Sequence, residues 1–322
     1  MRKSRLMLVA FVLVTLGLQI MMAGSVLAAD RFVIGYVTKT LINDPFQVLM
    51  ANAAKEAGEA RGAEVLLYGG SGQAAIEEEM TIVENLIAQD VDGIVLNPLD
   101  ARALIPAVRK INQAGIPLVL IDNSIADGEY ITYIATDNVR GAALAAEYIA
   151  MLLNGEGKVA MIEGEPGGQA ANDRRKGFHD FMATVPGIEI VSSLTGHWTT
   201  EGAISATEAI LQAHPDVQAI FACADMMAVG VAQVLSRANR EDVILVSFDG
   251  IEEGLDLVKQ GKSAGDIAQF PTTIGSMSVD ILLDVLSGEK DAADYPKYMD
   301  SGTALITKYT VDAFAEEVLG IK

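Results

Sequence analysis

Polar and aromatic side chains follow several short apolar runs of this sequence. Carboxylates and amides exchange hydrogen bonds with several neutral hydroxyl groups at once, and an aromatic face suits the apolar C–H patches of a sugar ring. No serine–histidine–acid or cysteine–histidine arrangement accompanies them. These residue types predict recognition of a polyhydroxylated molecule without a catalytic step. The candidates are Asp44, Phe46, Asp122, Asn123, Asn172, Trp198, Asp249 and Gln269.

Each of the main candidates also has a purely structural interpretation. Asp44 precedes a predicted helix and could be its N-cap, a role that can coexist with ligand contact. Asp122 and Asp249 could simply terminate buried strands. Phe46 and Trp198 could belong to the core, although the neighbours of Trp198 are polar and favour ring stacking on a ligand.

Other positions are interpreted as structural. Asp225 is expected to cap the helix that follows it, and Met226 and Met227 are expected in the core. The glycine-rich stretch 69–72 lacks the Lys-Ser/Thr pair of a phosphate-binding loop, so it is interpreted as a turn.

A regular alternation of apolar runs and amphipathic stretches positions these side chains. The runs are apolar throughout, as parallel strands covered on both faces require. In open parallel sheets, ligands bind beyond the carboxyl ends of the strands, where the candidates fall. The predicted strands are 32–37, 63–68, 93–97, 118–121, 158–163, 188–194, 219–223, 243–248 and 265–268. The predicted helices are 46–60, 74–89, 101–114, 170–184, 201–213, 226–237 and 252–260.

These elements form two βαβ series of similar size, separated by a crossing over residues 131–137. The length of 322 residues also suits two domains. The predicted fold is therefore α/β, with two doubly wound lobes and a ligand cleft between them.

Charge and composition exclude several classes of protein. Acidic residues outnumber basic ones by 43 to 23, giving a net charge of −20, which repels nucleic acid and anionic membranes. A single cysteine, Cys223, excludes an intrachain disulfide and a multi-thiolate zinc site. The three histidines show no metal-ligand spacing. We expect no metal, no cofactor and no nucleic-acid partner.

The N-terminal residues predict export. Arg2, Lys3 and Arg5 precede an apolar stretch over residues 6–22, and small or neutral residues over 26–28 suit cleavage. Residues 1–28 are therefore interpreted as a secretory signal peptide. The alternative is an uncleaved membrane anchor, since the apolar stretch approaches the length needed to span a bilayer.

Several segments, taken in order, resemble the ribose-binding-protein family of periplasmic sugar-binding proteins, the type I solute-binding components of ABC importers. The similarity runs from about residue 32 to residue 308. Its order and spacing are more specific than any one motif. The segments are Asn43-Asp44-Pro45-Phe46, Asn97-Pro98-Leu99-Asp100, Ile121-Asp122, Thr136-Asp137-Asn138 with Gly141, Arg174 with Gly177-Phe178, His214-Pro215-Asp216, Asp225-Met226-Met227, Phe248-Asp249-Gly250 and Ile267-Ala268-Gln269.

The resemblance implies two Rossmann-like lobes joined by a three-stranded hinge, with crossovers near residues 135–137, 269–271 and 300–302. The N-terminal lobe would comprise 29–135 plus 270–300, and the C-terminal lobe 136–269 plus 301–322. The resemblance also implies a set of ligand contacts. These are Asp44, Phe46, Gln47, Asp122, Asn123, Asn172, Trp198, Asp249 and Gln269.

The sequence departs from members similar to the ribose receptors at four of the sites. Those members carry arginine at the positions of Asn123 and Asn172, asparagine at Ala224 and phenylalanine at Gln47. Loss of these groups predicts a changed specificity, because unpaired buried hydroxyls cost about 1–3 kcal/mol each. Few cations remain, Lys39 being the nearest, so the expected ligand is a neutral monosaccharide, polyol or cyclitol rather than a sugar phosphate.

The resemblance implies a binding protein in the periplasm that closes on its ligand and delivers it to the permease and ATPase subunits of an ABC importer. A chemoreceptor is a further candidate partner, and the protein is expected to be a monomer and not an enzyme. One alternative is a receptor for an autoinducer or nucleoside. Another is a secreted carbohydrate-active enzyme using paired carboxylates. A sugar-responsive transcription regulator would need a DNA-binding segment where the export signal stands.

Overall fold

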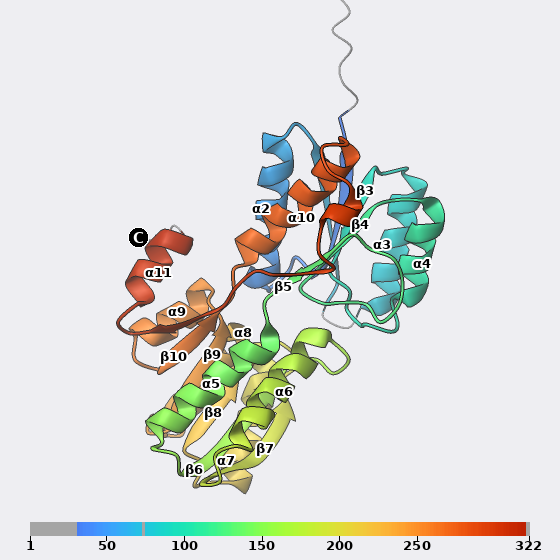
Figure 1. Cartoon of the computed structure of the whole chain (residues 1–322). Coiled ribbons are helices and arrows are strands. Elements are labelled where there is room, and N and C mark those ends of the chain that lie inside the picture. Colours follow the sequence, from blue (N-terminus) through green and yellow to red (C-terminus); the bar gives the residue numbers. More distant parts are fainter. Residues whose placement is uncertain (1–30, 73–74, 320–322) are drawn as a thin grey trace, which may run out of the picture.

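A computed structural model describes residues 31–72 and 75–319 of the chain, so the export signal predicted over residues 1–28 lies outside the described residues. The chain forms two α/β lobes, each built on its own six-stranded sheet (Figure 1). None of the helices in the described ranges combines the length and apolar character needed to cross a bilayer.

The first lobe has a wholly parallel sheet in the order β11-β5-β4-β3-β1-β2. Its strands are β1 (Val33–Thr40), β2 (Glu64–Gly70), β3 (Gly93–Leu96), β4 (Leu118–Ile121), β5 (Tyr133–Ala135) and β11 (Tyr298–Asp300). Its helices are α2 (Pro45–Ala60), α3 (Ile76–Ala88), α4 (Ile105–Ala114) and α10 (Pro271–Leu286), with a 3-10 turn at Ala292–Asp294.

The second lobe repeats this order as β12-β10-β9-β8-β6-β7, with only β12 antiparallel. Its strands are β6 (Gly157–Glu163), β7 (Ile188–Thr195), β8 (Ala219–Ala222), β9 (Ile244–Asp249), β10 (Gly265–Ala268) and β12 (Ala304–Thr307). Its helices are α5 (Asn138–Leu152), α6 (Gln169–Met182), α7 (Thr200–Ala213), α8 (Asp225–Arg237), α9 (Glu252–Lys259) and α11 (Val311–Val318).

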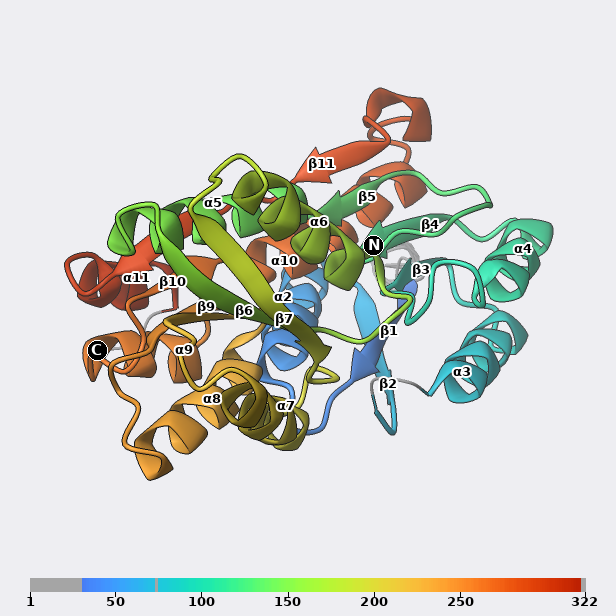
Figure 2. The same ribbon diagram turned by 90° about the horizontal axis from the view of Figure 1, so that it is seen from below.

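Helices cover both faces of each sheet, which explains the continuous apolar strands. In the first lobe, successive strand residues alternate between two cores, so Val119 faces the side of α2 and α10 while Leu118 and Leu120 face that of α3 and α4. Figure 2 shows α5 and α6 on one face of the second sheet and α7 and α8 on the other. In both lobes the first strand lies between the second and third, so the connections reverse direction there, the position where such folds bind ligands.

The chain passes between the lobes three times, after β5, after β10 and between β11 and β12. The crossings are hydrogen-bonded to one another: the Thr136 hydroxyl lies 3.1 Å from the Ser301 hydroxyl, and the Thr303 hydroxyl donates to the Ala268 carbonyl at 2.9 Å. We take residues 136, 269 and 301 as the points where the two lobes divide.

Glycine allows close helix packing in each lobe. A Cβ on Gly275 of α10 would lie 2.0 Å from the carbonyl oxygen of Met50 in α2, and one on Gly177 of α6 would lie 2.1 Å from that of Val139 in α5. Both helix pairs therefore depend on a residue without a side chain.

Glu79 of α3 is a buried carboxyl that supports the turn after β3. Its Oε2 accepts a hydrogen bond from the backbone N–H of Leu99 at 3.0 Å, and the residue is 1% exposed. Burial raises the pKa of Glu79 to about 8, although the Leu99 N–H and the Lys39 ammonium oppose the rise. The group is therefore mainly protonated at neutral pH.

We predict that Gly275→Ala destabilises the protein by about 1–3 kcal/mol, because the added methyl group overpacks the contact between α2 and α10. Thermal unfolding of the purified protein measures the effect. Gly72→Ala is the matched control, since a Cβ there meets no described atom within 4 Å. Equal melting temperatures for both variants would contradict this packing argument.

We also predict that Glu79→Gln makes stability less dependent on pH. Because the folded-state pKa of Glu79 lies above its ordinary value of 4.5, its contribution favours folding at low pH and is lost as the pH rises from about 4.5 to 8. Urea unfolding at pH 5 and pH 8 should show a smaller difference in Glu79→Gln than in the wild type. The exposed neighbour Glu77→Gln should behave as the wild type does; a wild-type slope in Glu79→Gln would count against a protonated Glu79.

Candidate functional site

A small cavity lies between the lobes at the carboxyl ends of the central strands. Both lobes contribute side chains to it. The lining residues are Lys39, Asp44, Phe46, Gln47, Asp122, Ala170, Arg174, Trp198, Ala224, Met226, Asp249, Ile251 and Gln269.

The first lobe contributes a buried ion pair. The Nζ of Lys39, at the end of β1, lies 2.7 Å from the Oδ2 of Asp122, which directly follows β4. Asn97 donates a second hydrogen bond to the same oxygen at 3.0 Å. Burial would raise the pKa of Asp122, but the Lys39 ammonium, together with the Arg174 charge and the Asn97 hydrogen bond, holds the pKa below its usual range. The Asp122 carboxyl is therefore ionised at neutral pH.

Gln47 is fixed in the same network. Its Oε1 accepts hydrogen bonds from the Asn97 amide at 2.9 Å and from the Thr38 hydroxyl. These bonds orient the side-chain amide, whose Nε2 has no hydrogen-bond partner within the described ranges. The first lobe thus offers an oriented donor to the cavity.

The second lobe contributes a similar pair. Asp249, at the end of β9, accepts hydrogen bonds from the Arg174 guanidinium at 3.1 Å and from the Gln269 amide at 2.7 Å. Burial raises the pKa of Asp249 to about 7; Arg174 opposes the rise and the neighbouring Asp266 adds to it. Arg174 itself is 3% exposed and also donates to Asn138 at 2.8 Å.

Gln269 presents an acceptor that no described group satisfies. Its Nε2 is bound to Asp249, while its buried Oε1 has no hydrogen-bond partner within residues 31–72 and 75–319. A buried polar atom without a partner is costly. A ligand hydroxyl in the cavity would satisfy it.

Two aromatic rings stand at the cavity. Phe46 is 6% exposed at the start of α2, and Trp198 is half-buried at the turn before α7. The Trp198 ring centroid lies 5.4 Å from the Arg174 guanidinium carbon and 5.9 Å from the Lys39 Nζ, so cations of both lobes approach one indole. The indole also occupies the space where a Cβ on Gly164 would be.

Three cavity residues have backbone angles that ordinarily favour glycine. Their φ values are +58° for Asp122, +60° for Trp198 and +134° for Asp249. Such conformations cost about 1–3 kcal/mol each and concentrate at functional sites. Here the conformations coincide with two of the carboxylates and one of the rings that line the cavity.

Seven of the nine ligand contacts predicted from the sequence line the cavity. They are Asp44, Phe46, Gln47, Asp122, Trp198, Asp249 and Gln269. Asp44 lines the cavity and also caps α2, since its Oδ1 accepts a hydrogen bond from the backbone N–H of Gln47.

The other two predicted contacts do not line the cavity. Asn172 is exposed on α6, because it lies about 200° around the helix from Ala170, which does reach the cavity. Asn123 is 1% exposed but lies behind the lining: its amide donates to Asn97 at 3.2 Å and its Oδ1 accepts from the backbone of Ala170 at 2.9 Å. Neither side chain lies in the cavity lining, and direct ligand contact by Asn123 and Asn172 stays a prediction.

Sequence reasoning also missed part of the lining. Arg174 stands one helical turn after Ala170, so both share the cavity face of α6. The expectation that Lys39 would be the main nearby cation was therefore too narrow. Met226, expected in the core, also lines the cavity. Helical phase was the signal that could have found Arg174.

Asp225 is buried behind the cavity and does not line it. It is the first residue of α8, and its Oδ2 accepts a hydrogen bond from the backbone N–H of Ile251 at 3.0 Å. It therefore supports the start of the neighbouring helix α9 rather than its own. Across the described residues, no group of three or more acidic, histidine or cysteine side chains is arranged to hold a metal ion.

Comparison with known proteins agrees with this architecture. The family model described as a periplasmic binding protein domain matches residues 34–290. The ribose import binding protein of Bacillus subtilis is 34% identical over 260 residues, covering 81% of this chain and 83% of the relative.

Solved structures give the same result. An ABC transporter periplasmic solute-binding protein from Actinobacillus succinogenes with bound D-allose has a TM-score of 0.82 and 28% identity, covering 88% of this chain and 100% of that one. A solute-binding protein from Bacillus halodurans with bound myo-inositol has a TM-score of 0.81 and 25% identity, covering 88% and 97%. With the family model matching most of its length and a relative at 34% identity covering four-fifths of it, this chain belongs to the periplasmic binding protein family.

Proposed function

We propose that this protein is the periplasmic solute-binding component of an ABC importer and binds a neutral sugar or sugar-like polyol between its lobes. The observation that carries the proposal is the cavity, in which each lobe supplies a paired carboxylate and an oriented amide. Asp122 and Gln47 come from one lobe, and Asp249 and Gln269 from the other.

The charges of the cavity favour a neutral ligand. Both cations are already engaged, Lys39 with Asp122 and Arg174 with Asp249, so neither needs a ligand anion. A sugar phosphate would also meet two carboxylates. Hydroxyl groups suit the site better, because they both donate to carboxylates and accept from amides.

The relatives support this ligand class without selecting one compound. One is named for ribose, and two structural neighbours hold D-allose and myo-inositol. The free Nε2 of Gln47 and Oε1 of Gln269 fit any of these as donor and acceptor for ring hydroxyls. A pentose, hexose, polyol or cyclitol is the ligand class proposed.

Ligand binding is coupled to closure of the lobes. Because the cavity walls belong to different lobes, a ligand makes its full set of contacts only when the lobes are together, and its binding shifts the population toward the closed form. The three hydrogen-bonded crossings form the hinge. The permease would bind the closed form. A chemoreceptor is a further candidate partner.

The periplasmic location rests on the family and on the basic and apolar residues of the predicted export signal. We propose that the exported protein acts as a monomer, with the permease and ATPase subunits of the importer as its partners. A receptor for an autoinducer or nucleoside on the same fold is tested by the same ligand panel as the sugar proposal.

A secreted carbohydrate-active enzyme is the second candidate, favoured by one observation. Asp122 and Asp249 line one cavity, with pKa values displaced in opposite directions, as in acid–base pairs. The ion pairs with Lys39 and Arg174 favour binding instead, because they engage both carboxylates. If the wild-type protein released sugar from an aryl glycoside and the Asp249→Asn variant did not, the protein would be an enzyme.

We predict that at least one neutral polyhydroxylated compound stabilises the mature protein. A panel of pentoses, hexoses, polyols and cyclitols is tested by melting temperature and by Trp198 fluorescence, together with a nucleoside panel. A ligand at 100 times its Kd stabilises by about 2.7 kcal/mol, which raises the melting temperature measurably. If only nucleosides produced a shift, the sugar proposal would be wrong.

We predict that Asp249→Ala weakens binding of the selected ligand about 10- to 100-fold, because a charged hydrogen-bond partner contributes about 1.5–3 kcal/mol. Titration calorimetry measures the change, and circular dichroism checks that the variant is folded. Asp256→Ala, an exposed carboxylate of the same lobe, is the matched control. Unchanged affinity in a folded Asp249→Ala variant would place the site elsewhere.

A further inference from the structure

Helix α6 begins without a side-chain cap of its own. Its N-cap is Gly168, which has no side chain, so the first backbone N–H groups of the helix need other acceptors. The N–H of Ala170, the second residue of the helix, donates to the Oδ1 of Asn123 at 2.9 Å. Ala170 belongs to the second lobe and Asn123 follows β4 of the first, so the acceptor comes from the opposite lobe.

Asn123 is held in place by the first lobe. Its Nδ2 donates to the Oδ1 of Asn97 at 3.2 Å, and Asn97 in turn donates to Asp122 and Gln47 of the cavity. Asn123 is 1% exposed and is not among the lining residues. Its side chain therefore links the ligand-binding network of one lobe to the helix start of the other without facing the cavity.

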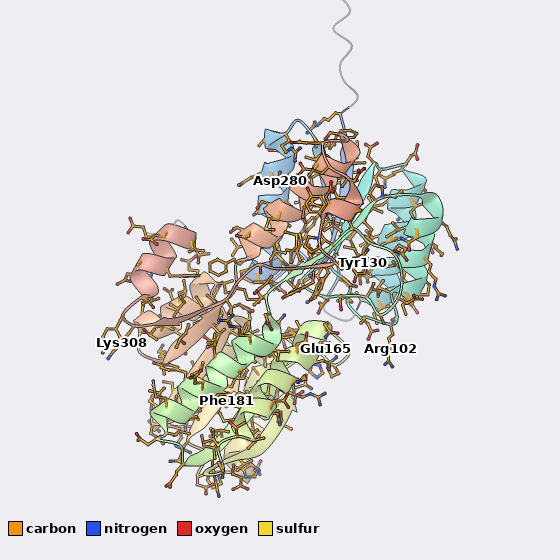
Figure 3. The ribbon with its side chains drawn as sticks, viewed as in Figure 1. Arg102, Tyr130, Glu165, Phe181, Asp280 and Lys308 are labelled. Carbon is orange, nitrogen blue, oxygen red and sulfur yellow. The ribbon has the colours of Figure 1, made fainter. Side chains whose placement is uncertain are left out.

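The two lobes also approach each other closely just before the start of α6. A Cβ on Gly167 would lie 2.4 Å from the Oδ2 of Asp100 in the first lobe. Figure 3 shows Glu165 and Arg102 on the facing edges of the two lobes, in the same region. The close approach of Gly167 to Asp100 exists only when the lobes are together, because the two residues belong to different lobes.

We propose that Asn123 is a positioning residue that caps α6 across the cleft and so stabilises the closed form. This inference rests on the proposed function only in assuming that the lobes open. In an open form the Ala170 N–H would face water, so the bond with Asn123 contributes to the closed state alone. A contact that changes only the closed population changes the affinity for every ligand by one factor.

The structure offers a second variant that shifts the same balance toward the open form, in this case by stabilising the open form itself. Gly168 has φ −72° and ψ 140°, a conformation open to serine, and a Cβ there would lie 3.7 Å from the Asn123 Oδ1. In Gly168→Ser, the new hydroxyl can cap α6 within its own lobe. The open form then no longer leaves the helix start uncapped, and closure loses part of its advantage.

The first experiment needs no ligand. Hydrogen–deuterium exchange at the Ala170 amide and small-angle scattering are measured on wild type, Asn123→Ala and the control Asn85→Ala, which alters an exposed asparagine on α3. We expect exchange at Ala170 about five- to tenfold faster and a larger radius of gyration in Asn123→Ala, with no change in Asn85→Ala. Equal exchange at Ala170 in wild type and Asn123→Ala would overturn the proposal.

The second experiment measures affinities for D-ribose, D-allose and myo-inositol. We expect Asn123→Ala to weaken binding of every compound that the wild type binds by one common factor of about five- to tenfold. Gly168→Ser should also weaken binding while raising the melting temperature, which loss of structure alone would not do. A changed ranking of the ligands in Asn123→Ala would show direct ligand contact and overturn the proposal. If the wild type bound no compound of the full panel, the ligand class would be wrong, whereas the exchange experiment would still decide the role of Asn123.

Discussion

A charge enclosed between two lobes needs a partner, and that requirement organises this molecule. Lys39 and Asp122 are paired within one lobe, and Arg174 and Asp249 within the other. Because each cation has a carboxyl partner in its own lobe, neither Lys39 nor Arg174 needs a partner from the opposite lobe when the two come together. The amides of Gln47 and Gln269 are attached to these pairs through hydrogen bonds, directly or through Asn97, so the ion pairs also fix the groups offered to a ligand.

Pairing charges within each lobe also has a consequence for selectivity. When the cations of a site already have partners, an anionic ligand adds little binding free energy. An apolar ligand is also disfavoured, because it would bury the unpaired amide atoms without giving them hydrogen bonds. The cavity therefore discriminates through hydrogen-bond matching more than through net charge. Asp122 and Asp249 have strained positive φ values, which is consistent with their side chains being fixed in position for hydrogen bonding to a ligand.

The sequence allowed much of this arrangement to be predicted, for a definite physical reason. Central parallel strands are buried on both faces, so they appear as continuous apolar runs and the polar residue after each marks the binding edge; Asp122 and Asp249 were found in this way. The strands β5 and β11 have only three residues each, too few to form a recognisable apolar run, and they were not predicted. The helix α5, rich in alanine, was also missed between the two series.

The predicted set and the cavity lining differ mainly on helix α6. The position of a residue after a strand does not show which face of the following helix it occupies. Asn172 was therefore predicted at the cavity, although it lies on the outer face of α6. Arg174, two residues further on, lies on the cavity face and was not predicted. Asn123 differs for another reason. It follows a strand as expected, but Asp122 lines the cavity, whereas the Asn123 side chain contacts the start of α6 in the other lobe. Only the arrangement of the two lobes in space could show that contact.

The threefold passage of the chain between the lobes affects how the molecule is assembled. The first lobe receives α10 and β11 only after the chain has built most of the second, and the second receives β12 and α11 last of all. Neither core can therefore be completed from a single continuous piece of the chain. If such a polypeptide crossed a membrane from its N-terminus, neither lobe could complete its core until nearly all of the chain had emerged. The chain would then stay unfolded during translocation, and the two lobes would complete their folding together.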